Sequence, residues 1–166
     1  MGISILLQNS EAFQDVFLAD ISPDALQVAK QNYDTLISST QYDTRFIQSN
    51  LASFLESYEV FQQAPIILVA NLPYIPDETF DTNALENVQK REPRLAFVGG
   101  DDGLDLYREM FVQIRQAVSG CSFVMFLEMM TWQVEILKAE FGEWLEFEEV
   151  KTFHFNIRIV KTSFRV

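Results

Sequence analysis

The residues with the clearest potential for chemistry form one short segment, Asn71-Leu72-Pro73-Tyr74. It directly follows residues 66–70, a continuous apolar run typical of a strand buried on both faces of a parallel sheet. The side-chain oxygen of Asn71 and the backbone carbonyl of Leu72 could accept both N–H groups of one planar nitrogen, and the Tyr74 ring could pack beside it. Pro73 adds no competing N–H and stiffens the turn. A plain strand-to-loop turn is the alternative interpretation.

Such a site would suit transfer of a group to a weakly nucleophilic nitrogen. The lone pair of an amide nitrogen is delocalised into its carbonyl group. Accepting hydrogen bonds from both N–H groups orients the nitrogen and favours lone-pair density on it. The exocyclic amine of adenine presents a similar planar nitrogen, so the four residues alone leave both substrates open.

A second candidate group is the carboxylate of Asp20, which closes the short apolar segment 16–19. An acidic residue at the end of a strand in a nucleotide-binding sheet can accept both hydroxyl groups of a ribose. The alternative is an ordinary strand-end carboxylate before a turn. Ser22 and Pro23 follow as the start of a helix, with Ser22 as the N-cap.

Strand-like and helix-like segments alternate along the chain, which predicts an α/β fold. We expect a Rossmann-like sheet with an antiparallel pair of strands at its C-terminal end. Ligands of such sheets bind beyond the carboxyl ends of the strands, where both candidate groups lie. The expected order is helix 3–13, strand 16–19, a helix from Ser22, strand 45–48, short helix 52–58, strand 66–70, an irregular stretch 75–103 with a helix near 84–90, helix 107–117, strand 123–127, helix 134–141 and the strand pair 147–153 and 157–164.

Composition narrows the class of protein. The chain has 166 residues and 48% apolar content, enough for a single core. A formal net charge of −12 does not suit direct nucleic-acid binding, which needs a basic surface, whereas a protein or a small molecule fits. Cys121 is the single cysteine of the chain and His154 its single histidine, so no metal site is predicted. A single cysteine, no signal peptide and no membrane-spanning run indicate a cytoplasmic protein.

Several segments resemble the HemK-type protein-glutamine N5-methyltransferases, which act on peptide chain release factors. Residues 20–26 resemble the ribose-binding segment of that family, and residues 71–76 its catalytic loop. The most specific block runs from Glu92 to Ala96 and from Gly99 to Leu104, with Tyr107-Arg108 after it. Further matching residues are Ala29, Asn32, Leu127, Glu128, Gln133, Asn156 and Arg158.

The resemblance implies a fold, a cofactor, a partner and a set of site residues. The fold would be that of an S-adenosylmethionine-dependent methyltransferase, with S-adenosyl-L-methionine as cofactor. The protein partner would be a release factor, methylated on the glutamine of its Gly-Gly-Gln loop. The catalytic loop would consist of Asn71, Leu72, Pro73 and Tyr74, and the cofactor would be bound by Gly2, Asp20, Ile21, Asn50, Leu51 and Asn71.

Two positions depart from the family pattern. Leu72 stands where many members have a proline, but its carbonyl group is still available. Asn50 stands where the family has an aspartate near the adenine, so one charge is lost while a hydrogen-bonding group is kept.

The resemblance begins inside the family's glycine-rich loop, with Gly2 as its last glycine. We therefore expect residues 1–166 to represent one catalytic domain without the first strand, most of that loop and the family's N-terminal helical domain. A sheet that lacks its central strand would have two unpaired edges. Methylation of a ribosomal-protein glutamine or of adenine is one alternative function, and a catalytically inactive truncated binding module is another.

Overall fold

The computed structural model describes residues 6, 13, 15–37, 42–58, 61, 65–82, 93–118, 122–150 and 157–164. The chain divides into two compact units, Met1–Ser57 and Tyr58–Val166. Within the part of the chain that the structure covers, no helix is long and apolar enough to cross a membrane.

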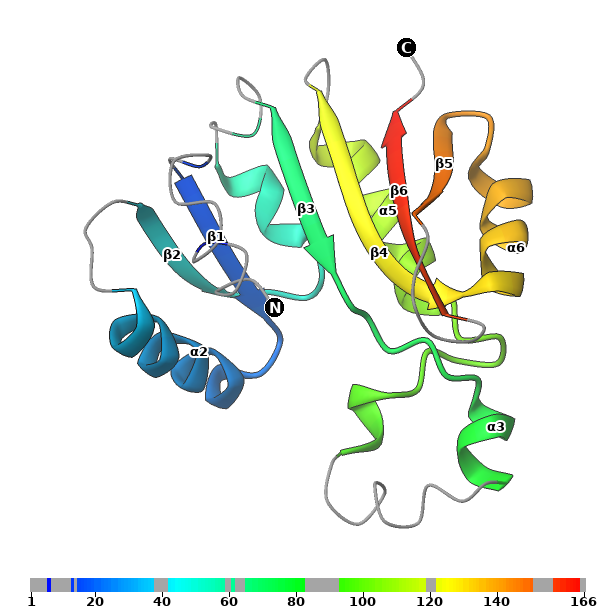
Figure 1. Ribbon diagram of the computed structural model, residues 1–166, viewed down its shortest axis with the longest axis horizontal. Coiled ribbons are helices and arrows are strands. Elements are labelled where there is room, and N and C mark those ends of the chain that lie inside the picture. Colours follow the sequence, from blue (N-terminus) through cyan, green and yellow to red (C-terminus); the bar gives the residue numbers. More distant parts are fainter. Residues whose placement is uncertain are drawn as a thin grey trace. The chain divides into compact units, whose positions relative to one another are not determined.

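The first unit contains a parallel pair of strands and one long helix (Figure 1). Strand β1 (Asp15–Asp20) pairs in parallel with β2 (Asp43–Gln48), and α2 (Pro23–Leu36) connects them. A short 3-10 helix, Ser53–Ser57, follows β2. From β1 onward, the order of elements in this unit confirms the sequence prediction.

The helix α2 begins where the sequence predicts. The Ser22 side chain accepts a hydrogen bond from the Ala25 backbone N–H at 3.2 Å, and Pro23 occupies the first turn, where its missing N–H is not needed. In the small core of this unit, the Tyr42 hydroxyl donates to the Leu6 carbonyl at 3.2 Å.

The second unit is built on a four-stranded sheet with the order β3-β4-β6-β5. The strands are β3 (Ile66–Ala70), β4 (Phe123–Met130), β5 (Leu145–Val150) and β6 (Ile157–Phe164). The β3–β4 pair is parallel, and β6 is antiparallel to both β4 and β5. A parallel pair that leads into an antiparallel C-terminal pair is the predicted arrangement.

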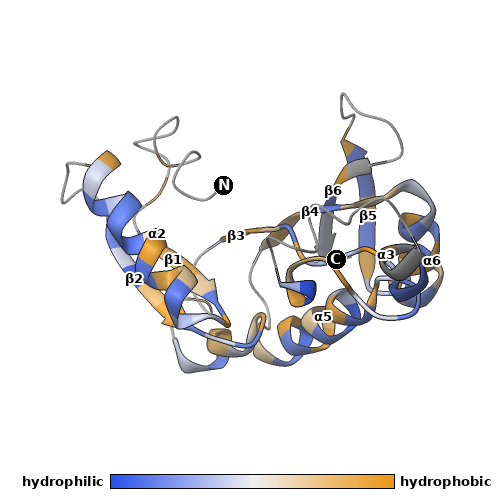
Figure 2. Cartoon of the chain, turned by 90° about the horizontal axis from the view of Figure 1, so that it is seen from below, coloured by the Kyte–Doolittle hydropathy of each residue, from blue (hydrophilic) through white to orange (hydrophobic). Residues whose placement is uncertain are grey.

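Two helices contribute to the core of this unit. Helix α5 (Asp105–Ala117) corresponds to the predicted helix 107–117. It buries one face at helical spacing, formed by Tyr107, Met110, Ile114 and Ala117, and Figure 2 shows its hydrophilic positions alongside the hydrophobic ones. Helix α6 (Thr131–Phe141) follows β4 directly and packs on β4, β5 and β6. The Phe111 ring joins the two helices through an edge-to-face contact with Phe141.

Between β3 and α5, the described residues 71–82 and 93–104 contain two short helical segments that the sequence does not predict. They are the short helix α3 (Asp77–Thr82) and a 3-10 helix, Arg94–Ala96, beyond the end of β3 (Figure 1). Neither is long enough to show a hydrophobic period. The helices expected at 3–13 and near 84–90 lie outside the described residues, apart from Leu6 and Phe13.

One sequence prediction about β3 is wrong. Its continuous apolar run predicts burial on both faces, but Ile67 is 56% exposed and Val69 is 36% exposed. Among the described residues, β3 is hydrogen-bonded only to β4. The run of residue types correctly identifies a strand, whereas the exposure depends on which neighbours cover it.

Candidate active site

The Asp20 carboxylate lies at the carboxyl end of β1 and is exposed. Its Oδ1 accepts a hydrogen bond from the Ser22 backbone N–H at 2.9 Å, which holds the carboxylate at the turn into α2. Only one of its two oxygens is used in this contact. The side chain of Ile21, 53% exposed, provides an apolar surface beside it. The geometry suits a carboxylate that accepts hydrogen bonds from the hydroxyl groups of a ligand.

The Asn50-Leu51 segment lies beside Asp20 because β1 and β2 run in parallel and end together. The backbone N–H of Ser49 donates to the Asp20 carbonyl at 3.0 Å, and the Gln48 side chain donates to the Ile21 carbonyl at 3.2 Å. Both bonds link the end of one strand to the end of the other. The structure therefore brings together four of the residues that the resemblance implies for the cofactor.

The conformation of Leu51 is unusual for a residue with a side chain. Its φ angle is +53°, in the left-handed region that non-glycine residues rarely adopt. The buried Ser49 side chain holds this turn, since its hydroxyl lies 3.3 Å from the Leu51 carbonyl and 3.0 Å from the Ser53 hydroxyl. Residues held in such conformations are concentrated at ligand sites.

The Asn71–Tyr74 segment follows β3 in the second unit, as the sequence predicts. The Asn71 side chain is exposed and makes no hydrogen bond within the described part of the chain. Leu72, Pro73 and Tyr74 are half-buried. The amide of Asn71 is thus presented outward from a segment whose backbone is anchored.

The first anchor is the hydroxyl group of Tyr107 on α5. Tyr107 is fully buried, and its hydroxyl lies 3.3 Å from the Leu72 carbonyl oxygen and also donates to the Glu128 carbonyl oxygen. Burial raises the pKa of Tyr107 above its ordinary value, and the negative charges that Tyr74 and Glu128 can carry add to this effect. The hydroxyl therefore remains protonated and able to donate.

The second anchor is a hydrogen bond from the Tyr74 hydroxyl to Glu128 Oε1, at 3.0 Å. It fixes the ring orientation of Tyr74 relative to β4. Burial, together with the hydrogen bond and the negative charge of Glu128, raises the pKa of Tyr74 to about 12. Tyr74 is therefore a neutral hydrogen-bond donor at neutral pH.

The third anchor is the side-chain amide of Gln133 in the first turn of α6. Its Nε2 donates to the Tyr74 carbonyl at 2.8 Å and to the Asp102 carbonyl at 2.9 Å, while its Oε1 accepts the Met130 backbone N–H at 2.9 Å. The side chain has no exposed surface. One amide thereby joins the catalytic-loop candidate, the loop before α5 and the end of β4.

The glycines of residues 99–103 allow the backbone of this loop to approach the Asn71–Tyr74 segment closely. A Cβ atom on Gly103 would collide with the Tyr74 carbonyl and would lie 2.6 Å from Nε2 of Gln133. Gly103 also has a φ angle of +74°, which glycine adopts readily. A Cβ atom on Gly99 would collide with the Pro73 carbonyl oxygen.

Arg108 fixes the other side of the glycine loop. Its guanidinium forms two hydrogen bonds with the Asp102 carboxylate, at 2.9 and 2.6 Å, and two with Glu140, both at 2.8 Å. The hydrogen bond with Arg108 lowers the pKa of Asp102, and those with Glu140 and Asp102 raise the pKa of Arg108. The four bonds join α5, α6 and the loop.

The most specific sequence block is therefore, in its described part, a support for the Asn71–Tyr74 segment. A parallel bridge pairs Ile75 with Val98, and Arg94 forms an ion pair with Asp77 at 2.6 Å. Tyr107, Glu128 and Gln133 belong to the residues that match the family, but the resemblance implies no role for them. No pattern of residue types predicts which groups these side chains bind.

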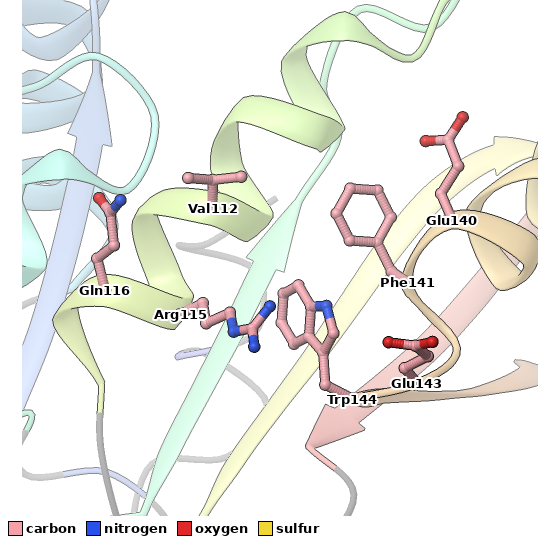
Figure 3. Close-up of a pocket in the computed structure, with 7 residues that line it drawn as sticks. All are labelled: Val112, Arg115, Gln116, Glu140, Phe141, Glu143 and Trp144. Carbon is pink, nitrogen blue, oxygen red and sulfur yellow. The ribbon is translucent and has the colours of Figure 1, made fainter.

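A surface hollow of about 610 Å³ lies elsewhere in the second unit, between α5 and the end of α6 (Figure 3). Arg115 points toward Trp144, with its guanidinium carbon 4.9 Å from the ring centroid. The hollow contains none of the predicted site residues. Gly2, also predicted to bind the cofactor, lies outside the described residues, and no group of three metal-binding side chains occurs among those described.

Comparison with solved structures places the chain in the α/β methyltransferase fold. The ribosomal protein L11 methylase of Lactobacillus delbrueckii gives a TM-score of 0.54 at 10% identity, covering 99% of this chain and 77% of that one. The Mtq2–Trm112 complex of E. cuniculi, described as methylating the termination factor eRF1, gives 0.50 at 14% identity (99% and 93%). A protein of Streptococcus mutans described as a methyltransferase, in complex with SAH, gives 0.51 at 12% identity (91% and 76%).

The sequence comparison identifies a narrower group. A release factor glutamine methyltransferase of Bacillus anthracis is 34% identical over 127 residues, and that of Clostridium acetobutylicum is 37% identical over 112 residues. A ribosomal protein uL3 glutamine methyltransferase of Francisella tularensis is 35% identical over 106 residues. These alignments cover 76%, 66% and 63% of this chain, but 41%, 36% and 31% of the relatives. No family model matches the chain.

Over most of its length the chain is similar in sequence to release factor glutamine methyltransferases, in agreement with the motif resemblance. It spans less than half the length of the curated relatives that it matches.

Proposed function

We propose that this chain transfers a methyl group from S-adenosyl-L-methionine to the side-chain amide nitrogen of a glutamine in a peptide chain release factor. The observation that carries the proposal is the Asn71–Tyr74 segment. It has an exposed asparagine amide, its backbone carbonyl groups are bound by Tyr107 and Gln133, and its Tyr74 hydroxyl is bound by Glu128. A segment fixed so firmly can present hydrogen-bond acceptors in one defined direction.

In the proposed reaction, this chain's residues orient the acceptor amide. The Asn71 side-chain oxygen accepts one N–H of the glutamine, and the Leu72 carbonyl accepts the other. The neutral Tyr74 ring packs on the flat amide group. The amide nitrogen would gain the methyl group that the bound cofactor supplies, and it would release one of its N–H protons to water. No covalent intermediate with the protein is involved.

The residues at the ends of β1 and β2 fit the cofactor. S-adenosylmethionine supplies the activated methyl group when it is bound. Asp20 has a carboxylate oxygen that its contact with Ser22 leaves for the ribose hydroxyl groups. The exposed side chain of Ile21 and the segment of Asn50 and Leu51 lie on the adjoining turns, where an apolar surface and a hydrogen-bonding group would suit an adenine ring.

Several predictions about the whole protein belong to this proposal. The release factor is its protein partner, and a cytoplasmic location follows from where translation is terminated. Residues 1–166 act as one catalytic domain in this proposal, and Gly2 and Asn71 are also assigned to cofactor binding by the family resemblance.

A second substrate, the glutamine of a ribosomal protein, is favoured by one observation. The relative in Francisella tularensis is named for that substrate, and its identity to this chain is similar to that of the release factor enzymes. Adenine in nucleic acid fits less well, because a net charge of −12 repels phosphate groups.

The test is a methylation assay with radiolabelled S-adenosylmethionine, using a release factor, ribosomal protein uL3 and RNA as acceptors. We expect label on the release-factor glutamine. Asn71→Ala should lower kcat by roughly a hundredfold or more, as loss of a preorganised hydrogen-bonding group does. Asp20→Ala should weaken cofactor binding by about ten- to a hundredfold, as loss of hydrogen bonds to a charged group does.

Two matched variants control for non-specific effects of these changes. Gln113→Ala removes an amide from the surface of α5, and Asp34→Ala removes an exposed carboxylate from α2. Both should leave activity unchanged. Label on the ribosomal protein alone would favour the second substrate. Cofactor binding that is equally strong in the wild type and Asp20→Ala would contradict the assigned cofactor contact, and no binding at all would favour a binding module.

A further inference from the structure

Tyr107 lies beneath the proposed acceptor site, although its side chain is completely buried. Its ring is part of the core face of α5, which explains an aromatic residue at this position but not the hydroxyl group. A phenylalanine would fill the same space without carrying a polar atom into the core. Burial of the hydroxyl group costs free energy unless the group is hydrogen-bonded.

The hydroxyl group lies between two backbone carbonyl groups. Its oxygen is 3.3 Å from the Leu72 carbonyl oxygen, and it makes a shorter contact with the Glu128 carbonyl oxygen. A phenol has one proton to donate, so the closer Glu128 carbonyl takes the larger share of it and the Leu72 carbonyl the smaller share. Leu72 follows the end of β3 and Glu128 belongs to β4, and the hydroxyl thus holds the carboxyl ends of two parallel strands together.

The Leu72 carbonyl has two lone pairs. A donor on its buried side uses one of them and restricts the direction of the carbonyl group. The second lone pair is then available to a donor on the opposite side. Rotation of the Leu72–Pro73 peptide group would break the contact with Tyr107, so the hydroxyl opposes any rotation of the carbonyl away from the acceptor site.

We propose that Tyr107 is a positioning residue, whose hydroxyl group orients the Leu72 carbonyl so that it accepts an N–H of the substrate amide. This inference rests on the proposed function, because it concerns the same acceptor site. Tyr107 itself does not contact the substrate. Its contribution should therefore be visible in the rate of transfer and not in the affinity for the cofactor.

The decisive variant is Tyr107→Phe, which keeps the ring in the core. We expect kcat to fall about tenfold, with the KM for S-adenosylmethionine unchanged. A tenfold change corresponds to ~1.4 kcal/mol, similar to the net contribution of one neutral hydrogen bond. The matched control is Tyr42→Phe, since Tyr42 is also buried and also donates to a backbone carbonyl, that of Leu6. Both variants should lower the melting temperature to a similar extent, and only Tyr107→Phe should lower kcat.

A second measurement is independent of activity. Leu72-Pro73 is the only Leu-Pro pair in the sequence. Labelling leucine with ¹³C at the carbonyl and proline with ¹⁵N therefore gives a single carbonyl–nitrogen cross-peak in a ¹³C-detected spectrum. The ¹³C shift of a carbonyl responds to the hydrogen bonds that it accepts. The peak should move in Tyr107→Phe, and it should also move when a Gly-Gly-Gln peptide is added to the wild type, but not with Gly-Gly-Glu.

The outcomes separate this inference from the proposed function. An unmoved peak in Tyr107→Phe overturns it, whatever the activity. A moved peak with wild-type kcat also overturns it, because the bond would then be only structural. If the wild type methylates nothing, the proposed function fails, and the peptide titration alone tests the role of Tyr107. A response to Gly-Gly-Gln that is weakened in Tyr107→Phe supports the positioning role. No response to the peptide contradicts it.

Discussion

Replacing Gln133 with leucine should disturb both the stability of the second unit and its candidate active site. The side chain is fully buried, and its amide makes three hydrogen bonds with backbone groups of Met130, Tyr74 and Asp102. Leucine has a similar volume but no polar atoms. The substitution should therefore leave one N–H and two carbonyl groups without these partners, and create little cavity.

The expected cost follows from the number of groups and their surroundings. An unsatisfied buried polar group costs about 1–3 kcal/mol. Tyr74 and Asp102 are half-buried, so water can partly replace the lost bonds and the lower part of that range applies. About 1–2 kcal/mol for each of the three groups gives a loss of about 3–6 kcal/mol. That is a large fraction of the ~5–15 kcal/mol that stabilises a typical domain.

Urea unfolding followed by tryptophan fluorescence measures this loss. Both tryptophans of the chain, Trp132 and Trp144, belong to the second unit, so their fluorescence reports on that unit. Gln113→Leu on α5 is the matched control and should change stability by less than ~0.5 kcal/mol. A loss below ~1 kcal/mol for Gln133→Leu, similar to that of the control, would refute the conclusion that the three hydrogen bonds of Gln133 stabilise the second unit.

Three further predictions concern the same region. Gly103→Ala should lower the unfolding free energy by more than ~1 kcal/mol, because φ is +74° and the Cβ atom would collide with the Tyr74 carbonyl. An unchanged urea midpoint would contradict the close approach of Gly103 to Tyr74. The pKa of Tyr74, raised to about 12 by burial and Glu128, should appear as a late phase in an ultraviolet titration that Tyr74→Phe removes and Glu128→Gln shifts downward. Because this pKa is raised from 10.0, the associated stability should be complete below pH 10.0 and disappear as the pH rises through about 12. The hydrogen bond with Arg108 lowers the pKa of Asp102, so the stability that this ion pair contributes is present above the ordinary carboxyl pKa and lost as the pH falls through the lowered value. Asp102→Asn should therefore make acid unfolding less dependent on pH. An identical pH dependence would show that the ion pair does not stabilise the fold.

Local sequence determined the elements that carry the candidate site. The Ser22-Pro23 pair predicts the start of α2, and the apolar run before Asn71 predicts β3, because caps, turns and strand-forming residues act over a few neighbouring positions. The buried face of α5 is also readable, since its period reflects one helix packing on one sheet. The same patterns place Asp20 and Asn71 at strand ends.

The tertiary structure decided what surrounds those residues. The exposure of Ile67 depends on what pairs with and covers β3, and its apolar side chain carries no sign of that. The Tyr107 hydroxyl reaches the Leu72 carbonyl across 35 positions of the sequence, and Gln133 reaches the Tyr74 carbonyl across 59. Backbone carbonyl groups are the same in every residue, so no sequence pattern marks the ones that a distant side chain will bind; only the packing of α5 and α6 against the parallel strands selects them.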